Sequence, residues 1–202
     1  LDASDFAIRL ENNILKENDI CLSFDDSLLC QFQIAFPILR NRNIKAFFFV
    51  YTSIFTNKPD LLEIYRLFRN TQFKSIDYFY VEFFKKVEEI SFSENLKHWN
   101  NFKKINYLKN FSFYSQNDKW FRYLRENYLG GHYHELMQEM MRDHNYNIER
   151  ESQNLWMTKK HLKELNYHGH IIGLHSHSHP TKITSLTYLK QLQQYKENLF
   201  HL

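Results

Sequence analysis

Residues 46–52, AFFFVYT, are apolar or aromatic up to the final threonine. A strand with one face in water alternates apolar and polar residues, so this unbroken run predicts a strand covered on both faces, as in a parallel sheet. Residues 20–24, ICLSF, are a second short run with β-branched and aromatic character. Residues 27–40 between the two runs are predicted to be helical. Strand, helix and strand over about 30 residues make a βαβ unit.

A third strand is predicted at residues 170–175, HIIGLH. The preceding segment, 157–169, has the pattern of an amphipathic helix, with Thr158 as its N-cap and Gly169 as its stop. Polar groups follow two of the three strands. Asp25 and Asp26 follow the first, and the third leads into histidines at positions 175, 177 and 179. Active sites of such folds lie at the carboxyl ends of parallel strands, so we expect these groups to meet there.

Residues 57–156 differ from the flanking segments. Apolar side chains recur three or four positions apart, as in amphipathic helices, over 77–90, 95–108 and 118–129. Gly130 and Gly131 interrupt this pattern. The sequence therefore predicts a large helical insertion between the second and third strands. Its aromatic residues are interpreted as core or lid packing, with a sugar-binding face as the alternative.

Composition limits the classes of partner. The chain has 202 residues, few glycines and prolines, and a formal net charge of +3 with neutral histidines. Such a composition predicts one domain with more helix than strand. The charges are mixed along the chain, and the concentrated basic stripe of a nucleic-acid-binding protein is absent from the sequence. No apolar run approaches the ~18 residues of a membrane span, so we expect no membrane span.

Two cysteines, Cys21 and Cys30, are too few for a disulfide framework. We interpret both as small, buried, apolar residues, which suits a reducing compartment. No signal peptide is visible, although the chain does not begin with methionine. A cytoplasmic location is the resulting expectation.

The Asp and His clusters together have the chemistry of a metal site. A carboxylate and two imidazoles are a suitable ligand set for a divalent ion, and His175 and His179 are close enough in sequence to face the same way. Three protein ligands leave one position open, as in catalytic sites, and a second carboxylate could act as general base. Taken separately, the Asp pair could be a solvated turn and the histidines a polar loop. A structural zinc site would need His177 as fourth ligand.

The same residues resemble a known family. SFDDS (23–27) is similar to the first motif of polysaccharide deacetylases with a NodB-type domain (carbohydrate esterase family 4), usually T-F-D-D-G, with Ser27 in place of glycine. HSHSHP (175–180) is similar to their second, histidine motif. NIKAFFFV (43–50) resembles the second strand, and the residues before and after the histidines also follow the family's order. The resemblance covers roughly 19–56 and 157–200.

The resemblance implies roles for four residues. Asp25 would be the general base, and Asp26, His175 and His179 would bind Zn²⁺ or another divalent ion such as Co²⁺, Ni²⁺ or Mn²⁺. The activity implied is metal-dependent hydrolysis of N-acetyl groups on amino sugars of a surface or envelope polysaccharide. A non-catalytic protein that binds metal or glycan is the alternative. His177 occupies a variable motif position, which predicts a solvent-facing or supporting side chain.

The resemblance also implies a fold. We expect an α/β, partial NodB-like distorted (β/α) barrel, made of residues 1–56 and 157–202, with a helical insertion at 57–156 and without the C-terminal barrel strands. The family's base-orienting Arg and general-acid His have no recognisable counterpart here, although His132 or His134 of the insertion could supply an acid. An open sheet edge would favour pairing of two chains, so a homo-oligomer is also expected.

Overall fold

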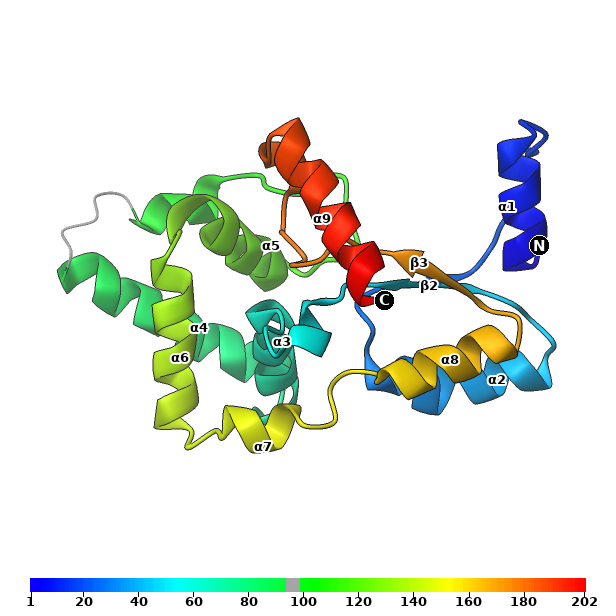
Figure 1. Cartoon of the computed structure of the whole chain (residues 1–202). Coiled ribbons are helices and arrows are strands. Elements are labelled where there is room, and N and C mark those ends of the chain that lie inside the picture. Colours follow the sequence, from blue (N-terminus) through cyan, green and yellow to red (C-terminus); the bar gives the residue numbers. More distant parts are fainter. Residues whose placement is uncertain (94–98) are drawn as a thin grey trace. The chain divides into compact units, whose positions relative to one another are not determined.

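The chain is an α/β protein that is mostly helical and contains a three-stranded parallel sheet (Figure 1). The computed structural model describes residues 1–93 and 99–202. It divides into two compact units, one of residues 1–61 and 149–202, which holds the sheet, and one of residues 62–148. The α/β class predicted from the sequence is confirmed. Among the described residues the sheet is open rather than closed into a barrel.

The sheet has the strand order β1-β2-β3. Its strands are β1 (Ser23–Phe24), β2 (Phe47–Val50) and β3 (Ile171–Leu174). Each lies within a predicted run, and the strongly apolar β2 occupies the centre. Phe47 is the pairing partner of both Ser23 in β1 and Ile171 in β3. Because all the strands are parallel, their carboxyl ends lie along one edge of the sheet.

One face of the sheet packs against two helices, α2 (Phe36–Asn41) and α8 (Lys159–Tyr167), seen beneath it in Figure 1. The buried core between them consists of Leu29, Phe36, Leu39, Ala46, Phe48, Val50, Met157, Leu162 and Leu165. The opposite face is less covered than predicted, since Phe47 and Phe49 are only half-buried. Phe6 of α1 (Ala3–Glu11) packs edge-on against Phe47 there, with ring centroids 6.2 Å apart.

The helix predicted at 27–40 begins later than expected. Residues 27–29 instead form antiparallel contacts with 155–157, in which the Met157 amide donates to the Ser27 carbonyl at 2.7 Å. The chain then makes a π-helical turn, η1 (Gln31–Ala35), before α2. The prediction was wrong here because a tertiary pairing uses backbone groups that a helix would have satisfied internally.

Helix α8 has the predicted ends. The Thr158 hydroxyl accepts a hydrogen bond from the His161 amide, and His161 Nδ1 accepts one from the Thr158 amide, which forms a reciprocal cap. Gly169 follows the helix with φ +85°, a conformation that glycine adopts without strain.

The second unit is helical and packed with aromatic rings. Its principal elements are α3 (Leu61–Thr71), α4 (Ile76–Ser93), η3 (Trp99–Lys104), α5 (Gln116–Tyr123), η4 (Leu124–Tyr128) and α6 (His132–Asp143). These confirm the helices predicted at 77–90 and 118–129, the latter with a π-helical turn at its end. Part of the predicted helix 95–108 lies outside the described residues, and the prediction was wrong for the rest, which is a 3-10 helix up to Lys104 and is not helical over 105–108. Phe79, Phe83 and Phe121 are fully buried, as the core-packing interpretation requires.

The remaining elements are η2 (Ser53–Thr56), α7 (Ile148–Ser152), η5 (Ile183–Ser185) and α9 (Tyr188–His201). In the described part of the chain, no helix has both the length and the apolar character that crossing a membrane requires. One prediction about cysteines was wrong, because Cys30 is exposed and Cys21 only partly buried. Cys30 immediately precedes the π-helical turn and lies outside the buried core.

Candidate metal centre

Asp26, His175 and His179 meet at the carboxyl edge of the sheet. Asp26 lies just beyond β1, and both histidines lie beyond β3. Oδ1 of Asp26 is 3.4 Å from Nε2 of His175 and 3.1 Å from Nε2 of His179. One ligand atom from each residue lies within 4.8 Å of the other two, and this is the one such group found among the described residues. Three of the four residues predicted as site residues therefore converge.

The spacing of these three ligand atoms suits a divalent metal ion. Ligands held about 2 Å from zinc in a tetrahedron are about 3.3 Å apart. The two Asp26–His distances, 3.1 and 3.4 Å, bracket that separation. All three side chains are partly buried and contribute nitrogen and oxygen donors, which zinc and its neighbours in the transition series accept. The donor set and its spacing therefore fit such an ion.

The backbone around the site is strained at four non-glycine residues. Asp26 and Ser27 have φ values of +72° and +59°, and Ser176 and His179 have values of +64° and +52°. Left-handed backbone at such residues costs of order 1 kcal/mol each and is concentrated at functional sites. These turns direct Asp26 and the two histidines toward one another. Glycine would adopt the left-handed backbone of Ser27 without strain.

The charges of the site stabilise one another. Burial raises the pKa of the Asp26 carboxyl, but hydrogen bonds from His175 and His179 outweigh that effect and bring the pKa below its usual range. Burial lowers the pKa of His179, but its hydrogen bonds to Asp26 and Asp60 raise the pKa to about 10. Without a metal ion, His179 is therefore a cation between two carboxylates. A metal ion that binds Nε2 of His179 must displace the proton on that nitrogen.

Two residues around His179 were missed by the sequence reasoning. Asp60 lies beyond η2, and its Oδ2 is 2.6 Å from His179 Nδ1. The ring of Tyr51, directly after β2, stacks on the His179 ring with centroids 4.9 Å apart and planes 22° apart. The position of Tyr51 at the end of the central strand was a usable signal. No sequence signal marked Asp60, because only the path of the chain after β2 brings it to His179.

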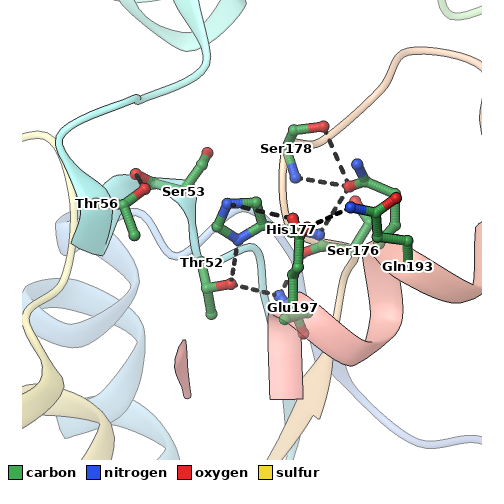
Figure 2. Close-up of polar contacts among 10 residues, drawn as sticks. Thr52, Ser53, Thr56, Ser176, His177, Ser178, Gln193 and Glu197 are labelled. Carbon is green, nitrogen blue, oxygen red and sulfur yellow. Dashed lines mark hydrogen bonds and ion pairs between the residues drawn. The ribbon is translucent and has the colours of Figure 1, made fainter. Parts of the chain in front are cut away.

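His177 points away from the three ligands. Its Nδ1 is 3.0 Å from the Thr52 hydroxyl, and its ring stacks on that of His201 in α9. Figure 2 shows His177 between Thr52 and Glu197, whose carboxylate is 3.9 Å from Nε2. The solvent-facing alternative is therefore wrong, because only 14% of the side chain is exposed. Its orientation also argues against His177 as the fourth ligand of a structural zinc site.

Helix α9 holds the histidine loop in place. Oε1 of Gln194 accepts hydrogen bonds from the amides of His177 and Ser178 at 3.0 and 2.8 Å. The amide group of Asn198, which is fully buried, donates to the Ser176 carbonyl and to the Val50 carbonyl. The Ser53 amide donates to the His177 carbonyl at 2.9 Å. These bonds fix the loop that carries His175 and His179.

The fourth predicted site residue, Asp25, has a different environment. Its side chain is exposed, and its backbone carbonyl accepts a hydrogen bond from Gln31. In the described part of the chain, no hydrogen bond or ion pair joins its carboxylate to the three ligands. His132 and His134, the alternative source of an acid, belong to the other unit, where they contact Glu135 and Tyr65 respectively.

Comparisons of the chain with protein-family models, with curated proteins and with solved structures found no match. The resemblance to polysaccharide deacetylases therefore depends on the sequence motifs alone.

Proposed function

We propose that the protein is a metal-dependent deacetylase that hydrolyses N-acetyl groups of amino sugars in a surface or envelope polysaccharide. The observation that carries the proposal is the convergence of Asp26, His175 and His179 at the carboxyl edge of a parallel sheet. These are the three residues that the resemblance to the NodB-type family assigns to the metal. They come from motifs about 150 residues apart in sequence.

Two further observations support the proposal. Ser27 occupies the place of the family's glycine and has the left-handed backbone for which glycine is suited. The order of the elements, with a strand before the Asp pair and a helix and strand before the histidines, also follows the family.

The chain's own residues would have distinct tasks. Asp26, His175 and His179 would hold the ion, and Asp25, the next residue to a ligand, would accept a proton from the attacking water. When bound, the ion would polarise the acetyl carbonyl and acidify a water molecule. Tyr51 and Asp60 keep His179 in place.

A second candidate function is non-catalytic metal or glycan binding. Asp25 favours it, because among the described residues no hydrogen bond or ion pair holds its exposed carboxylate toward the three ligands. A general base must be positioned at the water that it activates. The two candidates share the metal site and differ in whether Asp25 does chemistry.

Metal content tests what the two candidates share. After loading with Zn²⁺ and removal of excess metal, elemental analysis should find about one ion per chain, as a three-ligand site requires. Asp26→Ala and His175→Ala should lose it. His177→Ala, a histidine variant from the same loop that changes no ligand, should keep it. A wild-type protein without metal would overturn the deacetylase and the metal-binding function, and would leave glycan binding alone.

Hydrolysis then separates the candidates. N-acetylated chito-oligosaccharides are incubated with the zinc-loaded protein, and released acetate is measured. Asp25→Ala should keep its zinc and lose activity by roughly 10²- to 10⁴-fold, the usual contribution of a general base. Full zinc occupancy without acetate release in the wild type would support the binding function instead.

A further inference from the structure

The short contact between Asp60 and His179 has a geometry found at many metal sites. Metal-binding histidines usually donate their second ring N–H to a carboxylate, carbonyl or water, which fixes the tautomer and the direction of the ring. Asp60 Oδ2 lies 2.6 Å from His179 Nδ1, while Nε2 of the same ring faces Asp26 Oδ1 at 3.1 Å. The two nitrogens thus have different partners.

The ring of His179 is constrained in two ways. The stacked ring of Tyr51, which is fully buried, restricts its tilt. Asp60 restricts rotation about the Cβ–Cγ bond, because a half-turn would present a carbon instead of Nδ1 to the carboxylate. Such a half-turn would also move Nε2 away from its present position.

Asp60 is itself held close to the histidine loop. The segment before it is tied to that loop by the bond from the Ser53 amide to the His177 carbonyl, at 2.9 Å. The Lys58 amide and the Thr56 hydroxyl both donate to the Ser53 carbonyl, at 3.0 and 2.9 Å. The Asp60 side chain is 11% exposed, so its carboxylate is largely protected from competition by water.

We propose that Asp60 positions His179 for metal binding, by accepting the Nδ1 proton and presenting the Nε2 lone pair to the ion. The inference rests on the proposed metal site. His175 differs from His179, because among the described residues its ring has no second carboxylate partner. The dependence on a supporting carboxylate is therefore specific to one of the two histidine ligands.

The test is zinc affinity, measured by competition with a chromophoric chelator. Asp60→Ala should bind Zn²⁺ about 10- to 100-fold more weakly than wild type, the usual effect of losing such a partner. Asp60→Asn keeps an oxygen acceptor in the same place and should recover part of the affinity. Asp19→Ala is the matched control, since Asp19 is similarly buried and paired with Arg9 away from the site. It should bind like wild type.

A second readout follows the ring itself. NMR of the zinc-loaded wild type should show a protected Nδ1 proton on His179, and Asp60→Ala should lose that protection. Equal zinc affinity in wild type and Asp60→Ala would overturn the inference and leave the proposed function standing. If Asp60→Ala does not fold, Asp60→Leu, which fills a similar space without an acceptor, takes its place, and wild-type affinity in that variant would overturn the inference in the same way. A wild type that binds no zinc would overturn both.

Discussion

The side-chain amide of Asn198 donates a hydrogen bond to the backbone carbonyl of Val50 at 2.8 Å, although 148 positions separate the two residues. The same nitrogen donates to the carbonyl of Ser176 and lies 3.2 Å from the Thr52 hydroxyl. One buried amide therefore joins the end of the central strand to the histidine loop. This connection makes α9 part of the support of the metal centre.

Replacement of Asn198 should weaken both the fold and the site. Asn198→Ala leaves the Ser176 carbonyl without this donor in a buried place, which should lower the free energy of unfolding by about 1–3 kcal/mol. Zinc affinity should fall as the loop loosens. Urea unfolding measures the first effect. Gln193→Ala on the same helix, at an exposed residue whose side chain donates a hydrogen bond to Glu197, should change stability by less than about 0.5 kcal/mol. Wild-type stability in Asn198→Ala would contradict the role given to this residue.

Ser27→Gly should stabilise the protein. Ser27 is 1% exposed, has left-handed backbone, and its buried hydroxyl has no hydrogen-bond partner among the described residues. Removing the strain and the buried hydroxyl should raise the free energy of unfolding by about 1 kcal/mol. Ser27→Ala removes the hydroxyl alone and separates the two contributions. Ser27→Val should destabilise, because β-branched residues resist positive φ. The three variants are compared by urea unfolding, and a less stable Ser27→Gly would show that the strain is not there.

Gly173→Ala should destabilise the sheet for a steric reason. A Cβ at this position would lie 2.5 Å from Cδ1 of Phe49 on the adjacent strand. Moving the Phe49 ring should cost about 1–3 kcal/mol. In a Phe49→Ala background the same substitution should cost much less, so a double-mutant cycle measures the coupling. Equal costs in the two backgrounds would exclude the clash.

Without metal, stability should depend on pH through His179 and Asp26. The pKa of His179 is raised from 6.5 to about 10, so its contribution is complete below pH 6.5 and is lost as pH rises toward 10. The pKa of Asp26 is lowered from 3.8, so its contribution is complete above that value and is lost in acid. Stability should therefore decline on the alkaline side from about pH 6.5.

Urea unfolding with a metal chelator present, repeated from pH 5 to pH 10, measures this decline. His179→Asn removes the titrating ring and should flatten the alkaline decline. An identical decline in that variant would assign the pH dependence to other groups.

Much of the fold follows from local patterns that the sequence shows. The apolar run that became β2, the cap at Thr158 and the stop at Gly169 are short-range signals. They predict elements because each depends on neighbours within a few residues. The helix prediction for 27–40 was wrong at its start, where the Ser27 carbonyl accepts a hydrogen bond from the Met157 amide. No local pattern indicates that partner.

The candidate site was likewise predicted from the sequence only in part. The sequence by itself determined that Asp26, His175 and His179 follow the ends of strands, because the apolar runs and the polar residues that end them are local. Only the tertiary structure decided which residues support them. Asp60 contacts the histidine loop across 119 positions of sequence, and Asn198 joins that loop to Val50, which is 148 positions away. Such contacts arise when packed strands and helices bring distant backbone together, and no spacing within a segment encodes them.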